Sequence, residues 1–312
     1  MIHQGDCLSI LREQFADESV QCCETSPPYW GLRDYGVEGQ LGLEATPELY
    51  VAKMVEVFRE VKRVLKADGT LWINLGDTYS TGSGGNQTES LKQQSNGGTN
   101  MSPREAYKGL PTKNLVGIPW RVAFALQADG WYLRSDIIWH KPNPMPESVT
   151  DRCTKSHEYL FLLTKSERYY YDWEAIKEKG CDEVGTHRGG SLLKAAAGAK
   201  GDPMVQWHNH GGGIESLLAT GFRNKRTVWT IATEPYAEAH FATFPEALVT
   251  PCVLAGSRMG DTVFDPFVGS GTVVGVAERL GRNGVGTDLK WDYLKLAQQR
   301  TKQICMKYKE PL

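Results

Sequence analysis

The sequence predicts an α/β fold in which helices cover both faces of a mostly parallel sheet. Segments with the patterns of strands and of helices alternate along most of the 312 residues. A glycine-rich turn, residues 265–272, lies where a predicted strand passes into a predicted helix. The composition, with 40% apolar and 23% charged residues, is typical of a globular protein that buries a substantial core.

In the N-terminal half, each predicted element follows from a local pattern. The residues from Ser19 to Cys23 predict a short buried strand. From Pro47 to Lys66, apolar residues recur at intervals of three and four, which predicts a helix with Thr46 as its cap. The elements that follow are predicted as a strand over 70–77, a helix over 115–131 and strands over 132–141 and 157–166.

The C-terminal segment has the same alternating pattern. The order is an apolar helix within 244–257, the strand "DTVFD" ending at Asp265, the glycine-rich turn, and the helix "GTVVGVAERLG". The strand "NGVGTDL" and a last helix complete it. Because each strand is followed by a helix, the segment favours parallel pairing.

Two segments lack this periodicity. Residues 80–111 are rich in Gly, Ser, Asn and Gln, which is typical of a mobile loop. Residues 177–226 carry eight Lys or Arg against five Asp or Glu. On composition, this second segment is either a solvated insertion or a surface that binds phosphates.

Charge and cysteine usage narrow the class of protein. The formal net charge of -2 argues against a generally basic coat protein for nucleic acids, so any site for a polyanion must be regional. The seven cysteines are odd in number and show no CxxC spacing, which favours a reducing compartment over a disulfide framework or a zinc site. No apolar leader and no run of 18 apolar residues is present, and we expect a cytoplasmic protein with no membrane partner.

The turn "DPFVGSGT", Asp265 to Thr272, indicates a nucleoside site. Gly269 and Gly271 would let the backbone pass close to a ligand at the N-terminus of the next helix. Asp288 ends the following strand, where a carboxylate can accept hydrogen bonds from ribose hydroxyls. Val274 occupies the place of the third glycine of a dinucleotide fingerprint, which favours an adenosine-containing cofactor without a pyrophosphate over NAD.

The segment "TSPPYW", residues 25–30 and here called the Pro-Pro elbow, follows the first buried strand. Proline fixes φ and has no N–H, so the strand cannot continue. Ser26 Oγ and the Pro27 carbonyl could accept hydrogen bonds from the two N–H groups of an exocyclic amine and stabilise the charge that develops when it attacks. Tyr29 could stack on a base taken out of the duplex. The alternative is a turn whose aromatic rings pack in the core, and the role of Trp30 stays open.

A cysteine nucleophile and a metal site have weaker support. Carbon-5 methylation of cytosine needs a cysteine nucleophile, commonly after proline, and Pro251-Cys252 is such a dipeptide. Because it lies in an apolar helical stretch, we interpret Cys252 as a buried thiol. No histidine has the spacing of a metal ligand, so we expect no metal.

The order "TSPPYW" then "DPFVGSGT" resembles the beta group of amino-methylating DNA methyltransferases. The segments "GDCLSIL", "GTLWINLGD", "IIWHKPNPMP", "HEYLFLLTK" and "HFATFPEALV" are similar to family segments in family order. The resemblance implies a Rossmann-like sheet with circularly permuted motifs and S-adenosyl-L-methionine as the cofactor. It also implies double-stranded DNA as the substrate and a flipped base as the target.

The resemblance also implies roles for individual residues and parts of the chain. Residues 1–176 and 227–312 would form the catalytic and cofactor-binding parts of one domain, and 177–226 the target recognition region. The implied catalytic residues are Ser26, Pro27, Pro28 and Tyr29. The implied cofactor-binding residues are Asp6, Phe244, Pro245, Asp265, Phe267, Gly269, Gly271, Thr272 and Asp288.

A serine at the start of the catalytic tetrapeptide is usual in the family for N4 of cytosine, whereas Asp or Asn is usual for N6 of adenine. We therefore expect a cytosine-N4 methyltransferase, with adenine N6 as the alternative. A non-enzymatic DNA-binding protein would leave the glycine turn unexplained, and an NAD-dependent enzyme would leave the Pro-Pro elbow unexplained. The sequence leaves open the recognition sequence, a homodimer and a cognate restriction endonuclease.

Overall fold

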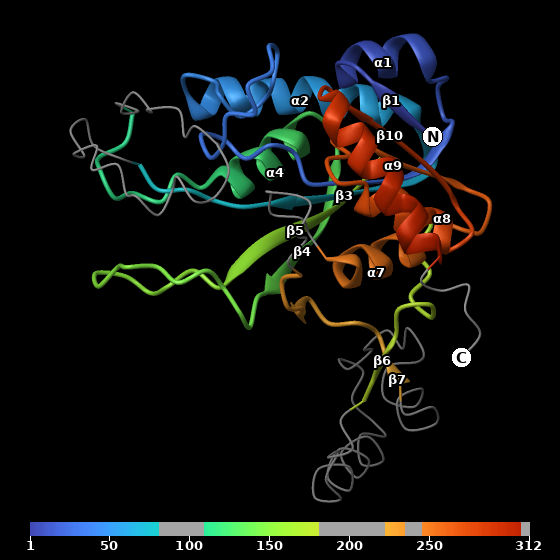
Figure 1. Ribbon diagram of the computed structural model, residues 1–312. Coiled ribbons are helices and arrows are strands. Elements are labelled where there is room, and N and C mark those ends of the chain that lie inside the picture. The colour runs from blue at the N-terminus through green and yellow to red at the C-terminus, as the bar shows by residue number, and fades with distance from the viewer. Residues whose placement is uncertain (81–108, 181–221, 235–244, 307–312) are drawn as a thin grey trace, which may run out of the picture. The chain divides into compact units, whose positions relative to one another are not determined.

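The computed structural model describes residues 1–80, 109–180, 222–234 and 245–306 (Figure 1). The chain forms two compact units, the first made of Met1–Asp172 with Thr227–Leu312 and the second of Trp173–Arg226. The loop predicted over 80–111 lies almost entirely outside the described residues, as do Phe244 and most of the segment 177–226.

The first unit is built on an eight-stranded sheet with the order β1-β10-β9-β2-β3-β5-β4-β8. β5 runs antiparallel to β3 and β4, and the other neighbouring strands described in this sheet pair in parallel. This confirms the predicted mostly parallel sheet. The strands are β1 (Ile2–Gln4), β2 (Val20–Thr25), β3 (Leu65–Leu75), β4 (Tyr132–His140), β5 (His157–Thr164), β8 (Val228–Thr230), β9 (Thr262–Asp265) and β10 (Asn283–Asp288).

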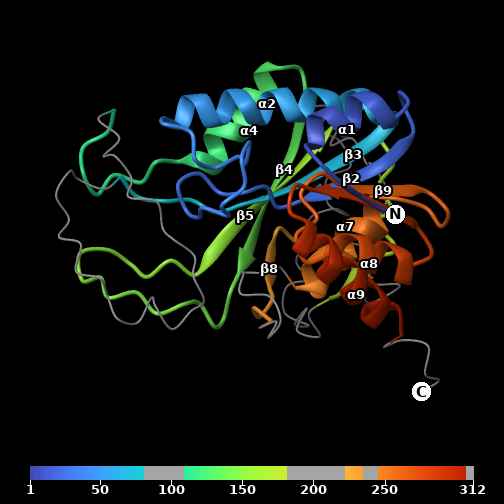
Figure 2. The same ribbon diagram turned by 45° about the horizontal axis from the view of Figure 1, so that its top comes forward.

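Helices cover both faces of this sheet, as the sequence predicts. Figure 2 shows α1, α2 and α4 on one side and α7, α8 and α9 on the other. No described helix is long and apolar enough to cross a membrane. The helices are α1 (Cys7–Gln14), α2 (Pro47–Val64), α4 (Ile118–Ala128), α7 (Glu246–Gly256), α8 (Thr272–Arg279) and α9 (Trp291–Met306).

Helix α2 begins where its sequence predicts and ends slightly earlier. The Thr46 side chain accepts a hydrogen bond from the Leu49 amide at 3.3 Å, and Pro47 lies in the first turn. The helix ends at Val64, and β3 starts directly at Leu65, so the sequence "ADG" lies within the strand and not after the helix. The register explains this difference: Val20 pairs with Leu65 but Cys22 pairs with Thr70, so the additional residues form a bulge.

Strand β2 lies at the centre of the sheet and is buried along its whole length. On the side of α1, α2 and α4, it contributes Cys23 to a core that includes Leu11, Phe58 and Phe161. Burial on both faces is typical of a strand in a parallel sheet. It also means that the polar residues Glu24 and Thr25 lie inside the protein.

The two ends of the chain meet in the sheet, because β2 pairs in parallel with β9 through Cys22–Val263 and Cys23–Phe264. β10 and β1 continue the parallel order beyond β9. The carboxyl ends of β2, β9 and β10 therefore lie at one edge of the sheet, which is the edge where open α/β sheets bind ligands. The Pro-Pro elbow, the glycine turn and Asp288 all follow at this edge.

The described part of the second unit is a short antiparallel pair, β6 (Glu178–Lys179) and β7 (Phe222–Arg223). The Glu178 carboxylate accepts hydrogen bonds from Arg223 at 2.9 Å and from Arg226 at 2.5 Å. These ion pairs hold the start and the end of the segment together. Its role in target recognition stays a prediction.

Candidate active site

A buried hydrogen bond joins the two predicted motifs. Thr25, the last residue of β2, donates from Oγ1 to Asp265 Oδ1 at 2.7 Å, and the Phe267 amide donates to the same oxygen at 2.9 Å. Thr25 and Asp265 are 240 positions apart in the chain. The segments that the sequence assigns to catalysis and to the cofactor therefore begin side by side.

The Pro-Pro elbow is anchored by its second half. The Pro28 carbonyl accepts a hydrogen bond from the Tyr50 hydroxyl at 2.9 Å. Trp30 Nε1 donates to the Glu44 carbonyl at 2.8 Å, and only 6% of the Trp30 surface is exposed. Trp30 is thus a core residue that holds the elbow in place. Pro27 is buried, and no described backbone amide donates a hydrogen bond to its carbonyl.

Three polar side chains converge at the start of the elbow. Ser26 Oγ lies 3.4 Å from Tyr29 Oη and 3.4 Å from Asn74 Oδ1. Tyr29 Oη lies 2.9 Å from the same Asn74 oxygen. Asn74 Nδ2 donates to the Tyr159 carbonyl at 3.2 Å, which directs its Oδ1 toward the two hydroxyls. The side-chain oxygen of Asn74 is therefore an acceptor shared by Ser26 and Tyr29.

An ion pair lies on the other side of Tyr29. The Tyr29 hydroxyl donates to Glu158 Oε2 at 2.7 Å, and Lys141 Nζ pairs with Glu158 Oε1. Only 18% of the Lys141 side chain and 17% of the Glu158 side chain are exposed. Burial, with the Glu158 carboxylate adding to it, raises the pKa of Tyr29 well above its usual value. The Tyr29 hydroxyl therefore stays protonated and acts as a donor.

The ring of Tyr29 is fixed by a glycine. A Cβ added to Gly76 would lie 2.5 Å from Tyr29 Cε2 and 2.8 Å from Cδ2, so the ring packs directly on the backbone that follows β3. Asn74 on β3 holds the hydroxyl end of the same ring. Tyr29 is thus held both at its ring edge and at its hydroxyl.

Backbone amides fix the orientation of the Asp288 carboxylate. Its Oδ2 accepts from the Gly269 amide at 2.9 Å, and its Oδ1 accepts from the Lys290 amide at 2.9 Å. The Gly5 amide donates to the Asp288 carbonyl at 3.0 Å, which places the chain just before Asp6 beside this residue. Asp6 itself caps α1, because its Oδ2 accepts from the Ser9 amide at 2.9 Å. Each Asp288 oxygen keeps a lone pair for a further donor.

The two glycines of the turn are in different environments. At Gly271, with φ +82°, an added Cβ would lie 2.8 Å from the Cα, Cβ and carbonyl oxygen of Ala297 in α9. At Gly269, with φ +50°, the nearest atom to an added Cβ is the Phe267 carbonyl oxygen at 3.9 Å. Close packing of α8 on α9 requires Gly271, whereas Gly269 borders open space that a ligand could fill.

The remaining predicted cofactor residues surround this turn. Thr272 begins α8 and is 2% exposed, and Phe267 packs against the core beneath the elbow. Pro245 is buried at the N-cap of α7. Their contacts with a cofactor stay predictions.

Two aromatic residues near Asp288 were not predicted. Tyr35, from the segment after the elbow, meets Tyr293 of α9 edge to face, with ring centroids 6.2 Å apart. Burial, followed by the nearby Tyr35 and Asp288, raises the pKa of Tyr293. Both hydroxyls lie close enough to Asp288 for its charge to contribute to raising their pKa, and nothing in the sequence links residue 35 to residue 293.

Three further residues of the site were not among the predicted catalytic or cofactor-binding residues, for a related reason. Lys141 follows β4 and Glu158 lies in β5, and they meet because His140 pairs with His157 in the antiparallel register. The sequence predicted both strands but not their register. Asn74 lies on the predicted strand "TLWINL", where a single polar residue in a buried run was the available signal.

Comparison with known proteins decides the family. The family model described as DNA methylase matches residues 20–299, which is most of the chain. The chain belongs to this DNA methylase family. The permuted order of its motifs agrees with the beta group of amino DNA methyltransferases that the sequence resembles.

Two curated relatives extend this assignment to type II methyltransferases. This DNA methylase is 48% identical over 300 residues to the type II methyltransferase M.Cfr9I of Citrobacter freundii, covering 96% of the chain and 86% of the relative. It is 49% identical over 284 residues to the type II methyltransferase M.SmaI of Serratia marcescens, covering 91% and 84%.

Solved structures show the same fold. The PvuII DNA methyltransferase, described as cytosine-N4-specific, superposes with a TM-score of 0.62 at 19% identity, covering 98% of this chain and 91% of that one. A putative DNA modification methylase of Thermus thermophilus, in complex with S-adenosyl-L-methionine, superposes with a TM-score of 0.59 at 24% identity, covering 97% and 93%.

The cysteine after Pro251 in this DNA methylase has no access to a base. Cys252 is 0% exposed within α7, and its thiol donates to the Leu248 carbonyl at 3.3 Å. A nucleophile for carbon-5 methylation must reach the ring of the base. The structure therefore agrees with the interpretation of Cys252 as a buried thiol.

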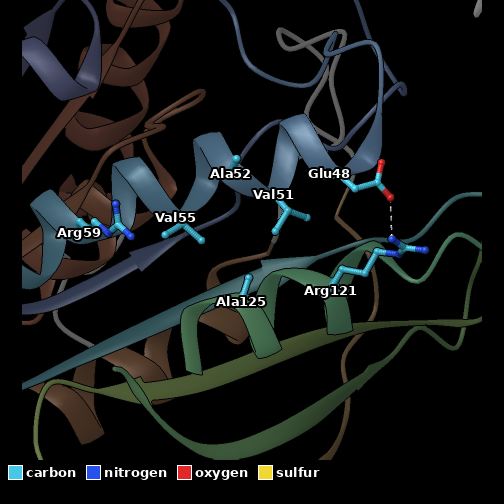
Figure 3. Close-up of a pocket in the computed structure, with 7 residues that line it drawn as sticks. All are labelled: Glu48, Val51, Ala52, Val55, Arg59, Arg121 and Ala125. Atoms are coloured by element: carbon cyan, nitrogen blue, oxygen red, sulfur yellow. Dashed lines mark hydrogen bonds and ion pairs between the residues drawn. The ribbon is translucent and has the colours of Figure 1, made fainter. Parts of the chain in front are cut away.

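A groove on the methylase surface lies apart from these residues. Figure 3 shows it between α2 and α4, where Arg121 forms an ion pair with Glu48 at 3.0 Å across the rim. Arg59, also at the groove, pairs with Asp129 at 2.5 Å. None of the predicted catalytic or cofactor residues lines the groove, and we place the reaction at the strand ends instead.

Two carboxyl groups of the methylase lie in the core beneath the site. Glu24 and Asp265 are each 1% exposed on adjacent strands. Burial raises the pKa of Asp265 to about 7, although hydrogen bonds from Thr25 and Phe267 act in the opposite direction. Burial, together with the neighbouring Asp265, raises the pKa of Glu24 well above its usual range.

These two groups predict how stability depends on pH. The unfolded chain ionises Asp265 near its ordinary pKa of 3.8 and the folded chain near 7, so the native state binds more protons between these values. The contribution of the pair to stability therefore falls as pH rises through this window. Glu24→Gln removes one ionisable group, and we expect its stability relative to wild type to increase with pH in urea unfolding. A stability difference independent of pH would contradict this.

Proposed function

We propose that this DNA methylase transfers a methyl group from S-adenosyl-L-methionine to the exocyclic N4 amine of a cytosine flipped out of duplex DNA. The observation that carries the proposal is the arrangement at the Pro-Pro elbow. Ser26 Oγ and the Pro27 carbonyl, which accepts from no described backbone amide, lie at the carboxyl edge of the sheet, directly after the strand that is tied to Asp265. Both are acceptors, and an exocyclic amine presents two N–H donors.

The cofactor residues fit such a donor molecule. Asp288 keeps lone pairs for ribose hydroxyls, and the open space at Gly269 allows a ligand to approach the backbone. When bound, S-adenosyl-L-methionine supplies an electrophilic methyl group on a sulfonium. Thr25, Asp265 and the start of α8 fix the distance between this turn and the elbow, so they position the two reactants relative to each other.

The elbow acts on the amine by hydrogen bonding. The lone pair of an exocyclic amine is delocalised into the base, which makes it a poor nucleophile. Acceptors on both N–H groups localise that lone pair and stabilise the positive charge that grows on nitrogen during attack. The prolines remove torsional freedom from the segment that carries both acceptors. Tyr29, held by Gly76, Asn74 and Glu158, presents a fixed ring on which the flipped base stacks.

Cytosine is the proposed base because a neutral hydroxyl, Ser26, leads the tetrapeptide. The same fold in a cytosine-N4-specific enzyme supports this choice. Adenine N6 is the second candidate, because its amine presents the same two donors. The names of the type II relatives lead us to propose a restriction-modification system, in which methylation protects the recognition site from a cognate endonuclease.

Product analysis tests the reaction and the base together. The protein is incubated with labelled S-adenosyl-L-methionine and mixed-sequence duplex DNA, and the DNA is digested to nucleosides. We expect the label in N4-methylcytosine. Label in N6-methyladenine would show that the target base is adenine and would keep the proposed mechanism. Label in 5-methylcytosine, or no label, would contradict the proposal that Ser26 Oγ and the Pro27 carbonyl hold the target amine. A heat-denatured sample of the same protein is the control.

A further inference from the structure

The proposed reaction imposes a direction on the hydroxyl of Ser26. To accept a hydrogen bond from the amine, Ser26 Oγ must direct a lone pair toward the base and its own hydrogen elsewhere. A hydroxyl rotates freely, so this direction has to be set by its neighbours. The inference below rests on the proposed function and concerns which residues set that direction.

The hydrogen bonds around Ser26 depend on the direction of the Tyr29 hydrogen. Ser26 has two described neighbours, Asn74 Oδ1 and Tyr29 Oη. The Asn74 amide nitrogen donates to the Tyr159 carbonyl, so Asn74 turns its oxygen toward Ser26. An amide oxygen can only accept a hydrogen bond. Tyr29 has a single hydrogen, with Asn74 Oδ1 at 2.9 Å and Glu158 Oε2 at 2.7 Å as its acceptors. Where the Tyr29 hydrogen goes decides which acceptors are left for Ser26.

We infer that Glu158, held by Lys141, is a positioning residue that makes Ser26 an acceptor for the target amine. The Glu158 carboxylate takes the hydrogen of Tyr29. Tyr29 Oη and Asn74 Oδ1 then both offer lone pairs to the hydrogen of Ser26. The Ser26 hydrogen points into the protein, and its free lone pair points to the base.

Lys141 keeps this arrangement in one orientation. Its Nζ pairs with the other carboxylate oxygen, Oε1, and lies 4.2 Å from the centroid of the Trp139 ring. Trp139 is 3% exposed and donates from Nε1 to the Ile231 carbonyl at 2.8 Å, so the ring is a fixed support. Because the Lys141 ammonium attracts oxygen, the amide oxygen of a glutamine at position 158 should take the place of Oε1. The orientation of that amide can therefore be predicted.

The variant Glu158→Gln is expected to reverse the direction. Lys141 would attract the amide oxygen of the new side chain, so the amide nitrogen would face Tyr29 and donate to its Oη. The Tyr29 hydrogen would then turn to Asn74 Oδ1, so Ser26 would lose Tyr29 Oη as an acceptor and would have to share Asn74 Oδ1 with Tyr29. We expect the single-turnover rate of methyl transfer to fall about tenfold, since the preorganised interaction with the developing charge is weakened but not removed. Affinities for DNA and S-adenosyl-L-methionine should change little.

A second variant separates this role from a structural one. Tyr29→Phe keeps the ring and the Lys141–Glu158 ion pair but removes the hydroxyl that competes for Asn74 Oδ1. Ser26 can then still donate to Asn74, so we expect a smaller loss than in Glu158→Gln. In the double variant, the glutamine amide at position 158 meets a phenylalanine ring without a hydroxyl. We therefore expect the double variant to transfer methyl as fast as Tyr29→Phe alone and faster than Glu158→Gln alone.

The matched control is Glu60→Gln, in which a carboxylate of similar exposure, 19%, loses its ion pair with Arg63 on α2. We expect it to keep the wild-type transfer rate. Thermal unfolding and equilibrium binding of DNA and cofactor are measured for every variant. The inference is overturned if Glu158→Gln transfers methyl at the wild-type rate, or if the losses of the two single variants multiply in the double variant. Wild-type protein that methylates no exocyclic amine would instead overturn the proposed function.

Discussion

Replacing Gly271 by alanine is expected to lower the free energy of unfolding by about 2 to 4 kcal/mol, from the left-handed backbone and overpacking together. The added Cβ would lie 2.8 Å from three atoms of Ala297, two of which belong to the α9 backbone. A flexible side chain could move aside, but here α8 and α9 must separate. Chemical denaturation with urea measures the loss.

Gly269→Ala is the matched comparison, because it makes the same change in the same turn. The backbone is again left-handed, with φ +50°, but an added Cβ meets nothing closer than 3.9 Å. We expect a loss of about 1 kcal/mol from the backbone conformation alone. Its larger effect should be on cofactor affinity, measured by calorimetric titration with S-adenosyl-L-methionine. Equal losses of stability in the two variants would contradict the distinction between them.

The contrast between these glycines shows what the sequence could not predict. The pattern "GSG" assigned both residues to the approach of a ligand. Ala297 lies 26 positions beyond Gly271, and only the packing of α9 on α8 brings it into contact. Local patterns identify where a special backbone conformation is needed. They do not show whether a ligand or a neighbouring helix requires it.

The fold was predictable to the level of element type and sheet class. Parallel strands place their carboxyl ends at one edge, so the elbow, the turn after Asp265 and Asp288 could be expected to meet. The pairing of Lys141 with Glu158 could not, because it depends on the register of an antiparallel pair whose connecting segment, 141–156, is proline-rich and too long for a turn type to set the register. The sequence also left the role of Trp30 open. Because Trp30 is buried and donates to the Glu44 carbonyl, it supports the elbow.

Ser26→Ala is expected to lower the single-turnover rate of methyl transfer by about a hundredfold to a thousandfold, which is the usual cost of removing one preorganised hydrogen bond to a developing charge. Alanine keeps the backbone of the elbow, including the Pro27 carbonyl and the Tyr50 contact of Pro28. The lost hydroxyl makes only long contacts of 3.4 Å within the protein, so stability and cofactor affinity should be nearly unchanged.

Ser19→Ala controls for the loss of a serine hydroxyl near the same strand, since Ser19 Oγ donates to the Ala16 carbonyl at 2.7 Å before β2. This variant should transfer methyl at the wild-type rate. If Ser26→Ala instead reduced cofactor affinity as strongly as transfer, Ser26 would belong to the cofactor site and would not hold the target amine. If it left transfer unchanged, the Pro27 carbonyl would be the sole acceptor, and the direction imposed by Glu158 would have no hydroxyl to act on.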